Sequence, residues 1–444
     1  MREEALDLAN YVVEKGRRLG FDEVASIVRI SRRVMVKFAN NEITVVQNWM
    51  DTTIALYLVK EAKCVLTRLV CRTKNDIDRA LKNVYDHMAH VEPSALYAPL
   101  PEPNGKTLEG LTDPKLVQSL GTTIEVVPQL IDEGLREGAQ RLAGTFHAGH
   151  RIKALVTSKG AELSEEGTFI EVYARAFYED NSGHWAWTST KFNDDRVLEV
   201  GRKAASYSKI RLPVTRIEPG RYNAILSPLV VGNLMSYVAR AASALATLLG
   251  LSMFTKYKPG TKIGSEIISI IDEPRDPLLP NSTGFDDEGI ETRTKYIIRK
   301  GIFESYLHNT KTATRMRGQL TGNAGWLQPH PWNVVVEPGD VDEDDIFCEV
   351  GEGIFVLNNW YTRYQNIVEG QFSTVSRDVV LYVKGGEPKS IIRRVRIAEV
   401  FPNLLNNIVG LTKTKYDVAW WEVKPPVRVP FVIAKNVLFT RPEV

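Results

Sequence analysis

Apolar residues in the first 90 positions recur first at helical spacing and then at strand spacing. Residues 4–19 predict an amphipathic helix that ends at Gly20. Asparagines at 40 and 41 fit a hairpin turn, because Asn tolerates positive φ, and residues 75–90 predict a second helix with Asn75 as its N-cap. The strand-like runs are 24–31, 33–39, 43–49, 52–59 and 63–71. This part of the chain is therefore predicted to be a β-meander flanked by two helices.

The next 130 residues continue the mixed pattern. Residues 92–114 contain five prolines and are expected to be a surface connection. Two further helices are predicted at 124–142 and 193–208. The strand-like segments between these helices are 151–158, 168–178 and 184–189. Residues 212–220 have the composition of a linker, so we place the main domain boundary there.

The second half is rich in short strands, apart from a long apolar helix at 229–249. A small helix is expected at 402–408. The strand-like runs are 222–226, 266–271, 295–298, 333–336, 354–357, 379–383 and 427–438. The predicted fold class is α+β with two domains. Residues 1–212 form a mixed α/β-meander domain, and residues 213–444 form an antiparallel β-rich domain with one long buried helix.

Residues 229–254 are apolar enough to require a membrane test. Their single charge, Arg240, would cost about 2.5–3.5 kcal/mol at the centre of a bilayer, and Asn233 and several serines lie nearby. We therefore expect a helix buried in a soluble protein. The N-terminus lacks the pattern of a signal peptide, and three cysteines without a CxxC pair fit a reducing compartment, so a cytoplasmic location is expected.

Charge and composition narrow the class of partner. Lys and Arg number 56 and Asp and Glu 54, a formal net charge of +2. Direct nucleic-acid binding would need a basic patch or stripe, so we expect none. With 43% hydrophobic residues the chain is also expected to be folded rather than disordered.

Metal-binding and nucleophile motifs are missing from the sequence. No histidine is followed by Glu, and no GxSxG, SxxK or P-loop occurs. Two histidine pairs have a spacing of three, His87 with His90 and His147 with His150. A zinc site also needs a third ligand, and none is evident nearby, so we interpret both pairs as structural histidines.

Two polar loops are the best candidates for a binding site. The acidic residues Asp286, Asp287 and Glu288 lie between glycines 284 and 289, and Thr321, Gly322 and Asn323 form a second tight loop. Such loops line sites through carboxylates, amides and backbone N–H groups, but they also occur as plain turns. Both interpretations stay open at this point.

The order of short motifs resembles the TldD/PmbA family. The second half carries them at 285–289 (FDDEG), Thr292, 298–306, 312–313 (TA), 321–323 (TGN), 337–339 (EPG), 369–373 (EGQFS) and 383–388 (VKGGEP). In the first half, residues 32–43 (RRVMVKFANNEI) are similar to that family's early strand–turn–strand. The resemblance is strongest over 282–339.

This resemblance implies a two-domain fold and a two-subunit peptidase that acts on peptides or unfolded segments. One subunit type, TldD, carries zinc on a helical HExxxH motif followed by a Cys, and the other type, PmbA or TldE, lacks these ligands. The corresponding helix here is 229–249, which contains no His or Glu, and no Cys follows Cys348. The resemblance therefore implies a PmbA/TldE-like subunit without catalytic residues or a bound metal of its own. Zinc is expected in a TldD-like partner.

The resemblance also implies the partners. A heterodimer with the TldD-like zinc subunit is the preferred hypothesis, in which Asp286, Asp287, Glu288, Thr321, Gly322 and Asn323 contact the peptide. The alternative is a homodimeric binding or regulatory protein, as in the description of PmbA as a modulator of DNA gyrase. A third hypothesis is a hydrolase with a metal held by His147, His150 and remote carboxylates.

Aromatic residues in the second half bear on partner surfaces. Most are expected in the core of the β-rich domain; they are Trp326, Trp332, Trp360, Tyr361, Trp420 and Trp421. Adjacent residues on a strand point to opposite faces, so one of Trp420 and Trp421 is expected to face outward.

Overall fold

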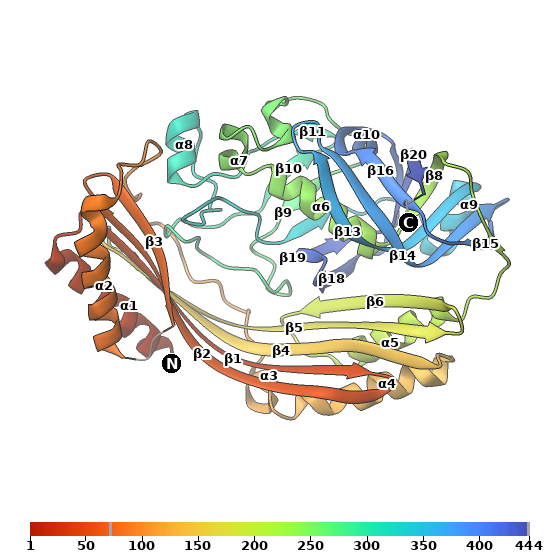
Figure 1. Ribbon diagram of the computed structural model, residues 1–444, viewed down its shortest axis with the longest axis horizontal. Helices are drawn as coiled ribbons and strands as arrows, with labels where there is room; N and C mark the ends of the chain where they lie inside the picture. Colours follow the sequence, from red (N-terminus) through yellow and green to blue (C-terminus); the bar gives the residue numbers. More distant parts are fainter. Residues whose placement is uncertain (71–72, 442–444) are drawn as a thin grey trace.

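A long curved antiparallel sheet forms the N-terminal half (Figure 1). The computed structural model describes residues 1–70 and 73–441, and within them this sheet has the order β3-β2-β1-β4-β5-β6. We call it the N-terminal sheet. Its strands are β1 (Glu23–Ala39), β2 (Glu42–Lys60), β3 (Lys63–Val70), β4 (Arg141–Thr157), β5 (Glu162–Tyr178) and β6 (Asn181–Ser189).

The strands of this sheet are longer than the sequence pattern predicts. The four runs predicted between 24 and 59 are two continuous strands, joined by a turn in which Asn40 and Asn41 have φ of 52° and 69° as expected. Polar residues within each run do not end the strand, because one face of the sheet is polar. Strand β4 likewise includes residues 141–150, of which 141–142 were predicted as helix. The predicted strand-like run 63–71 ends at Cys71, which lies outside the described residues.

Within residues 1–70 and 73–441, the helices that pack on the N-terminal sheet cover its outer, convex face (Figure 1). They are α1 (Arg2–Leu19), α2 (Lys74–His87), α3 (Pro114–Ser119), α4 (Val126–Glu137) and α5 (Asp194–Ser208). Helix α1 ends at Gly20, with φ 94°, as predicted. The N-cap of α2 is Thr73 rather than Asn75, because the Thr73 hydroxyl accepts the Asp76 N–H.

Even-numbered residues of β1 face the helices, and odd-numbered residues face the inner side. Val28 and Ile30 pack against α1 and α2, whereas Val34 and Val36 belong to the core cluster that contains α4 and α5. The period of two places every second side chain on the same face. The inner face is therefore free to be polar.

Two further sheets form the C-terminal half, which is mixed rather than purely antiparallel. The middle sheet has the order β11-β10-β9-β12-β19-β18, and the C-terminal sheet β13-β8-β20-β16-β14-β15-β7. Parallel pairs join β12 to β19, β13 to β8 and β15 to β7. The strands are β7 (Val214–Thr215), β8 (Gly220–Leu226), β9 (Ile270–Asp272), β10 (Lys295–Arg299), β11 (Ile302–Phe303), β12 (Val334–Val336), β13 (Glu352–Asn366), β14 (Gln371–Lys384), β15 (Glu387–Ile392), β16 (Arg396–Val400), β17 (Ile408–Leu411), β18 (Tyr416–Trp420), β19 (Val423–Val429) and β20 (Val432–Thr440).

The apolar helix predicted at 229–249 is two helices. Helix α6 (Pro228–Ala241) packs between the middle and C-terminal sheets, and α7 (Ala244–Leu248) follows it. The break has a tertiary cause, because the Ala242 carbonyl accepts from Leu307 N–H and the Ala244 N–H donates to the Leu307 carbonyl. These bonds replace helical ones, so local propensity does not predict the break. Among the described residues, no helix is long and apolar enough to cross a membrane.

The remaining helices are short. They are α8 (Thr310–Met316), α9 (Ile346–Val350) and α10 (Phe401–Asn406).

Aromatic rings form part of the contact between the two halves of the molecule. Trp420 is fully buried, and its ring centroid lies 4.5 Å from that of His184 on β6, whereas Trp421 is 47% exposed. The predicted division of this Trp pair between core and surface is therefore confirmed. Trp360 and Tyr361, predicted mostly as core, are exposed.

Candidate functional site

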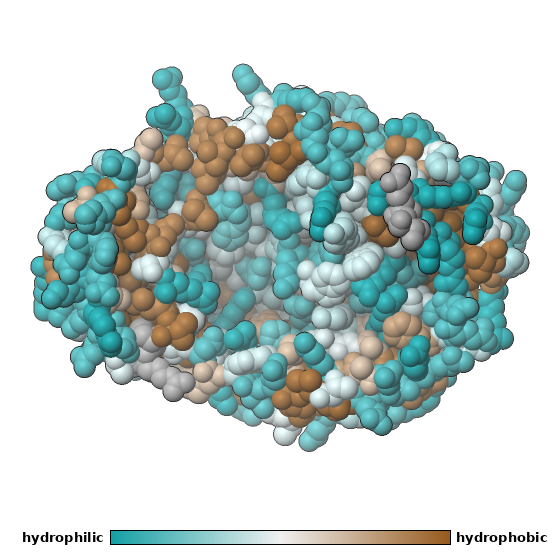
Figure 2. Space-filling view, viewed as in Figure 1, coloured by the Kyte–Doolittle hydropathy of each residue, from teal (hydrophilic) through white to brown (hydrophobic). Residues whose placement is uncertain are grey.

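A recess of about 480 Å³ lies between the inner face of the N-terminal sheet and loops of the C-terminal half. Strands β1, β4 and β5 contribute its floor, and residues 280–283, His330 and Trp332 contribute its other wall. The space-filling view shows the centre of the molecule hollowed between these two parts (Figure 2).

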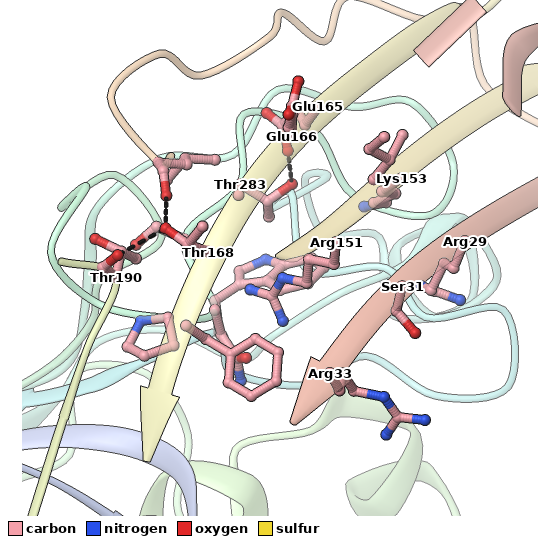
Figure 3. A pocket seen from close by; sticks show the side chains of 18 of the residues that line it. Arg29, Ser31, Arg33, Arg151, Lys153, Glu165, Glu166, Thr168, Thr190 and Thr283 are labelled. Carbon is pink, nitrogen blue, oxygen red and sulfur yellow. Dashed lines mark hydrogen bonds between the residues drawn. The ribbon is translucent and has the colours of Figure 1, made fainter. Parts of the chain in front are cut away.

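Cationic side chains from two strands form the floor of the recess. Arg29, Ser31 and Arg33 alternate along β1, and Arg151 and Lys153 alternate along β4 (Figure 3). In the antiparallel register Arg29 is opposite Lys153, and Ser31 is opposite Arg151. Two strands separated by more than 100 residues of sequence thus bring four cations onto one face of the sheet.

Most of these cations have an acidic partner. Arg29 and Lys153 each lie 3.6 Å from the Asp287 carboxylate, and Arg33 lies 3.3 Å from Asp51. Lys153 also donates a 3.0 Å hydrogen bond to the Phe285 carbonyl. Burial lowers the pKa of Lys153, and the carboxylate of Asp287 opposes that shift.

Arg151 is different, because its guanidinium has no hydrogen bond or ion pair with any described residue. It is half-buried on the floor and lies 5.9 Å from the centroid of the Phe169 ring. Burial, with repulsion from Arg29 second, lowers the pKa of Arg151 to about 10. The side chain therefore stays cationic at neutral pH and presents unused N–H donors to the recess.

The two histidines of β4 do not form a metal site. His147 faces the recess and packs on Phe169, with ring centroids 4.9 Å apart, whereas His150 is buried and bonds Glu166 at 2.6 Å. Residues three apart on a strand point to opposite faces, so the hypothesis that this pair shares a metal is wrong. Burial lowers the pKa of His147 to about 4, so its ring is neutral at pH 7.

The predicted acidic loop lies beside the recess, but two of its three carboxylates point inward. Asp286 accepts hydrogen bonds from the N–H groups of Glu288, Ile290 and Ala324 at 2.9–3.0 Å. Glu288 accepts from the Thr310 N–H and hydroxyl at the start of α8. Burial, followed by repulsion from Glu288, raises the pKa of Asp286. Of the three, only Asp287 faces the cationic floor.

The second predicted loop packs directly on the first. Thr321 bonds the backbone of His308, and Asn323 donates to the Asp272 carboxylate at 2.6 Å. Gly322 has φ 69°, and a Cβ there would lie 2.4 Å from the Glu291 carbonyl oxygen. The structure thus brings the two predicted loops together and uses their polar groups internally, apart from the Asp287 carboxylate. Peptide contact by these six residues stays a prediction.

The described residues contain no cluster of three His, Cys, Asp or Glu that could hold a metal ion. On helix α6, which corresponds to the helix expected to carry HExxxH, Asn233 instead accepts hydrogen bonds from Asn359 and Thr362 and donates to the Glu422 carbonyl. A catalytic zinc needs three protein ligands and an open position. The donor set around α6 consists of amides and hydroxyls, and it does not fit zinc.

The cationic floor was not identified from the sequence. Its signal is an alternation, RxSxR at 29–33 and HxGxRxK at 147–153, which marks one polar face on each strand. The alternation does not reveal that β1 and β4 are neighbours. Only that pairing turns two ordinary polar strand faces into one site.

Two family models match most of the chain. The PmbA/TldA metallopeptidase central domain matches residues 118–212, and the PmbA/TldA metallopeptidase C-terminal domain matches residues 219–441. The chain is 25% identical over 317 residues to a metalloprotease of Methanocaldococcus jannaschii, covering 68% of each chain. It is 27% identical over 213 residues to a metalloprotease PmbA homolog of Buchnera aphidicola, covering 48% of this chain and 46% of the relative.

Solved structures share the whole fold. TldE from Thermococcus kodakarensis matches with a TM-score of 0.86 and 20% identity, covering 97% of this chain and 99% of the other. A putative modulator of a DNA gyrase from Thermotoga maritima matches with a TM-score of 0.83 and 19% identity, covering 98% and 99%. These likenesses establish the α+β architecture, with its β-rich C-terminal half.

Substitution of the two adjacent aspartates separates the structural from the site-lining interpretation. Asp286→Ala leaves three buried N–H groups without an acceptor, so we expect a loss of about 2–4 kcal/mol in the free energy of unfolding. Asp287→Ala alone would leave the largely buried Lys153 unpaired, so it is made in a Lys153→Met background, where only the ion pair with the half-exposed Arg29 is lost and the cost should be less than about 1 kcal/mol. Urea titration measures both. Equal losses would contradict the internal role of Asp286.

Proposed function

Because this chain belongs to the PmbA/TldD metallopeptidase family, we propose that it is a non-catalytic, TldE/PmbA-like subunit of a cytoplasmic zinc peptidase complex. The complex acts on peptides or unfolded segments. In it a TldD-like subunit supplies the zinc, and this chain supplies one wall of the chamber that holds the peptide.

The main support for this proposal is that the histidines are dispersed rather than clustered as metal ligands. His147 and His150 lie on opposite faces of β4, His308 bonds Thr312, and His184 packs in the junction of the two halves. None has two further ligands beside it in residues 1–70 and 73–441. Activation of water by zinc requires such a set, so the hydrolytic step is assigned to the partner.

The proposal predicts that the purified chain binds little zinc. We expect less than about 0.1 zinc per chain by elemental analysis after dialysis against a weak chelator, because structural and catalytic zinc sites need three or four protein ligands. A zinc-bearing family member treated identically serves as the control. Stoichiometric zinc that survives dialysis would overturn the proposal.

An unpaired strand edge supports the existence of a partner subunit. Strand β3 pairs with β2 only from Thr53 onward, and no described strand pairs with the outer edge of residues 42–52. Apolar side chains on both faces of this segment are exposed; they are Ile43, Val45, Val46, Trp49 and Met50. Natural proteins cover or charge such an edge to prevent uncontrolled pairing. We assign this edge to the contact with the zinc-bearing subunit.

Charge placed on this edge should weaken the complex. We expect Val46→Lys to raise the Kd for the zinc-bearing subunit at least about 10-fold, because it buries an unpaired charge in the contact. Val409→Lys is the matched control, since Val46 and Val409 are 45% and 46% exposed and Val409 lies on β17. Sedimentation velocity measures both complexes. Equal Kd values for the two variants would contradict the assignment.

Oligomeric mass distinguishes the proposal from the alternative. A chain that forms a homodimer through the β2 edge and excludes the zinc-bearing subunit would favour a binding or regulatory protein without a peptidase role. A heterodimer favours the peptidase complex.

A further inference from the structure

The floor of the recess contains one cation, Arg151, that makes no hydrogen bond or ion pair with a described residue. Asp287 lies 3.6 Å from both Arg29 and Lys153, and Asp51 pairs with Arg33. Glu165 acts on Arg151 electrostatically, but its carboxylate accepts from Thr283, Gly284 and Leu108 and makes no ion pair with Arg151. Within the described part of the chain this leaves the half-buried Arg151 without an acceptor. A guanidinium carries five N–H donors, and their partial desolvation is unfavourable unless an acceptor arrives.

The surroundings of Arg151 leave room for that acceptor. Its direct neighbour across the β4–β5 ladder is Gly167, which has no side chain. Gly149, two residues before it on the same face, is also without a side chain; a Cβ there would lie 2.5 Å from the Phe169 ring and 2.9 Å from Arg33 Cγ. The absence of side chains at these two glycines lets Phe169 and Leu111 pack close to the sheet, and both line the recess beside Arg151.

Aromatic groups and one further polar atom border the same space. Phe169, Trp332 and the neutral ring of His147 line the recess. His147 Nε2 is buried and has no hydrogen-bond partner among the described residues. A ligand that fits this lining has a charged end for Arg151 and a carbon skeleton that packs on the rings. A volume of about 480 Å³ accommodates such a group rather than a bare ion.

We propose that Arg151 binds a carboxylate of the peptide, either the free C-terminus or an acidic side chain. The planar guanidinium matches a carboxylate in a bidentate arrangement, and partial burial strengthens the pair. A phosphate group carries more charge and draws on several cations, but Arg29, Arg33 and Lys153 already have acidic partners. The inference rests on the proposed function for the identity of the ligand as a peptide.

Direct binding to the full chain, without a partner subunit, tests the proposal. The probes are acetyl-Ala-Ala-Phe-Ala with a free C-terminus, the same peptide with a C-terminal amide, and acetyl-Ala-Ala-Glu-Ala amide. Isothermal titration should show the free acid binding at least about 10-fold more tightly than the neutral amide. Tighter binding of the Glu-containing amide than of the free-acid peptide would identify an acidic side chain as the source of the carboxylate.

Substitutions test whether the preference for the free-acid peptide over the amide depends on Arg151. Arg151→Met should abolish the difference in affinity between the free acid and the amide. Arg151→Lys should retain part of it, because Lys keeps the positive charge but lacks the planar guanidinium that binds a carboxylate with two hydrogen bonds. Arg141→Met is the matched control on the same strand, at an exposed position away from the recess, and should keep the full preference. Thermal melting checks that each variant is folded.

Three results would overturn the proposal. Equal affinity of the wild-type chain for all three peptides, or an unchanged preference in folded Arg151→Met, would remove the carboxylate site. Inorganic phosphate that binds as tightly as the free-acid peptide would indicate a simple anion site. Because these titrations need neither zinc nor a partner, a failure of the proposed function, seen as zinc bound by this chain, is distinguishable from a failure of this inference.

Discussion

The antiparallel pairing of β1 with β4 is the constraint on which the rest of the structure depends. It joins residues 25–38 to 144–157 in one register, with Ser31 opposite Arg151. One face of the joined strands is apolar and covered by helices, and the other carries the cations of the recess. A shift by one residue would exchange the two faces and bury those cations under the helices, so the packing of the core fixes the register of the site. The alternation of apolar and polar residues along β1 and β4 therefore serves both the stability of the fold and the cationic floor of the recess.

Local features were predictable from the sequence where local forces decide them. The helix that ends at Gly20, the turn at Asn40 and Asn41, and the helix predicted at 193–208 follow from periodicity and positive φ. Features set by distant contacts were not predictable. Helix α6 ends at Ala241 because Leu307 pairs with the backbone beyond it, and polar residues inside β1 are tolerated because they face the recess. The two predicted loops do lie together, but most of their side chains bond the surrounding structure, as Asp286 accepts from three backbone N–H groups.

Helix α6, which lies between the middle and C-terminal sheets, has the composition of a packing element rather than of a metal site. All of its side chains except Tyr237 and Arg240 are buried, and its one buried amide, Asn233, joins a network with Asn359 and Thr362. Such a network satisfies polar groups in the core and leaves no free ligands for a metal. Under the proposed function, the chain retains the family fold as a scaffold, and its distinctive contribution is the cationic floor of the recess. Division of labour between a zinc-bearing subunit and a peptide-holding subunit then accounts for both the α6 composition and the unpaired guanidinium.

Reconstitution tests this division of labour most directly. A zinc-bearing member of the family from the same organism is assayed on an unfolded peptide alone, mixed with this chain, and mixed with an equal amount of an unrelated protein. The account predicts no cleavage by this chain alone and cleavage by the mixture at least about 10-fold faster than by the zinc-bearing subunit alone, because the complex positions the peptide at the zinc. Equal rates with and without this chain, or cleavage by this chain alone that a chelator abolishes, would contradict it.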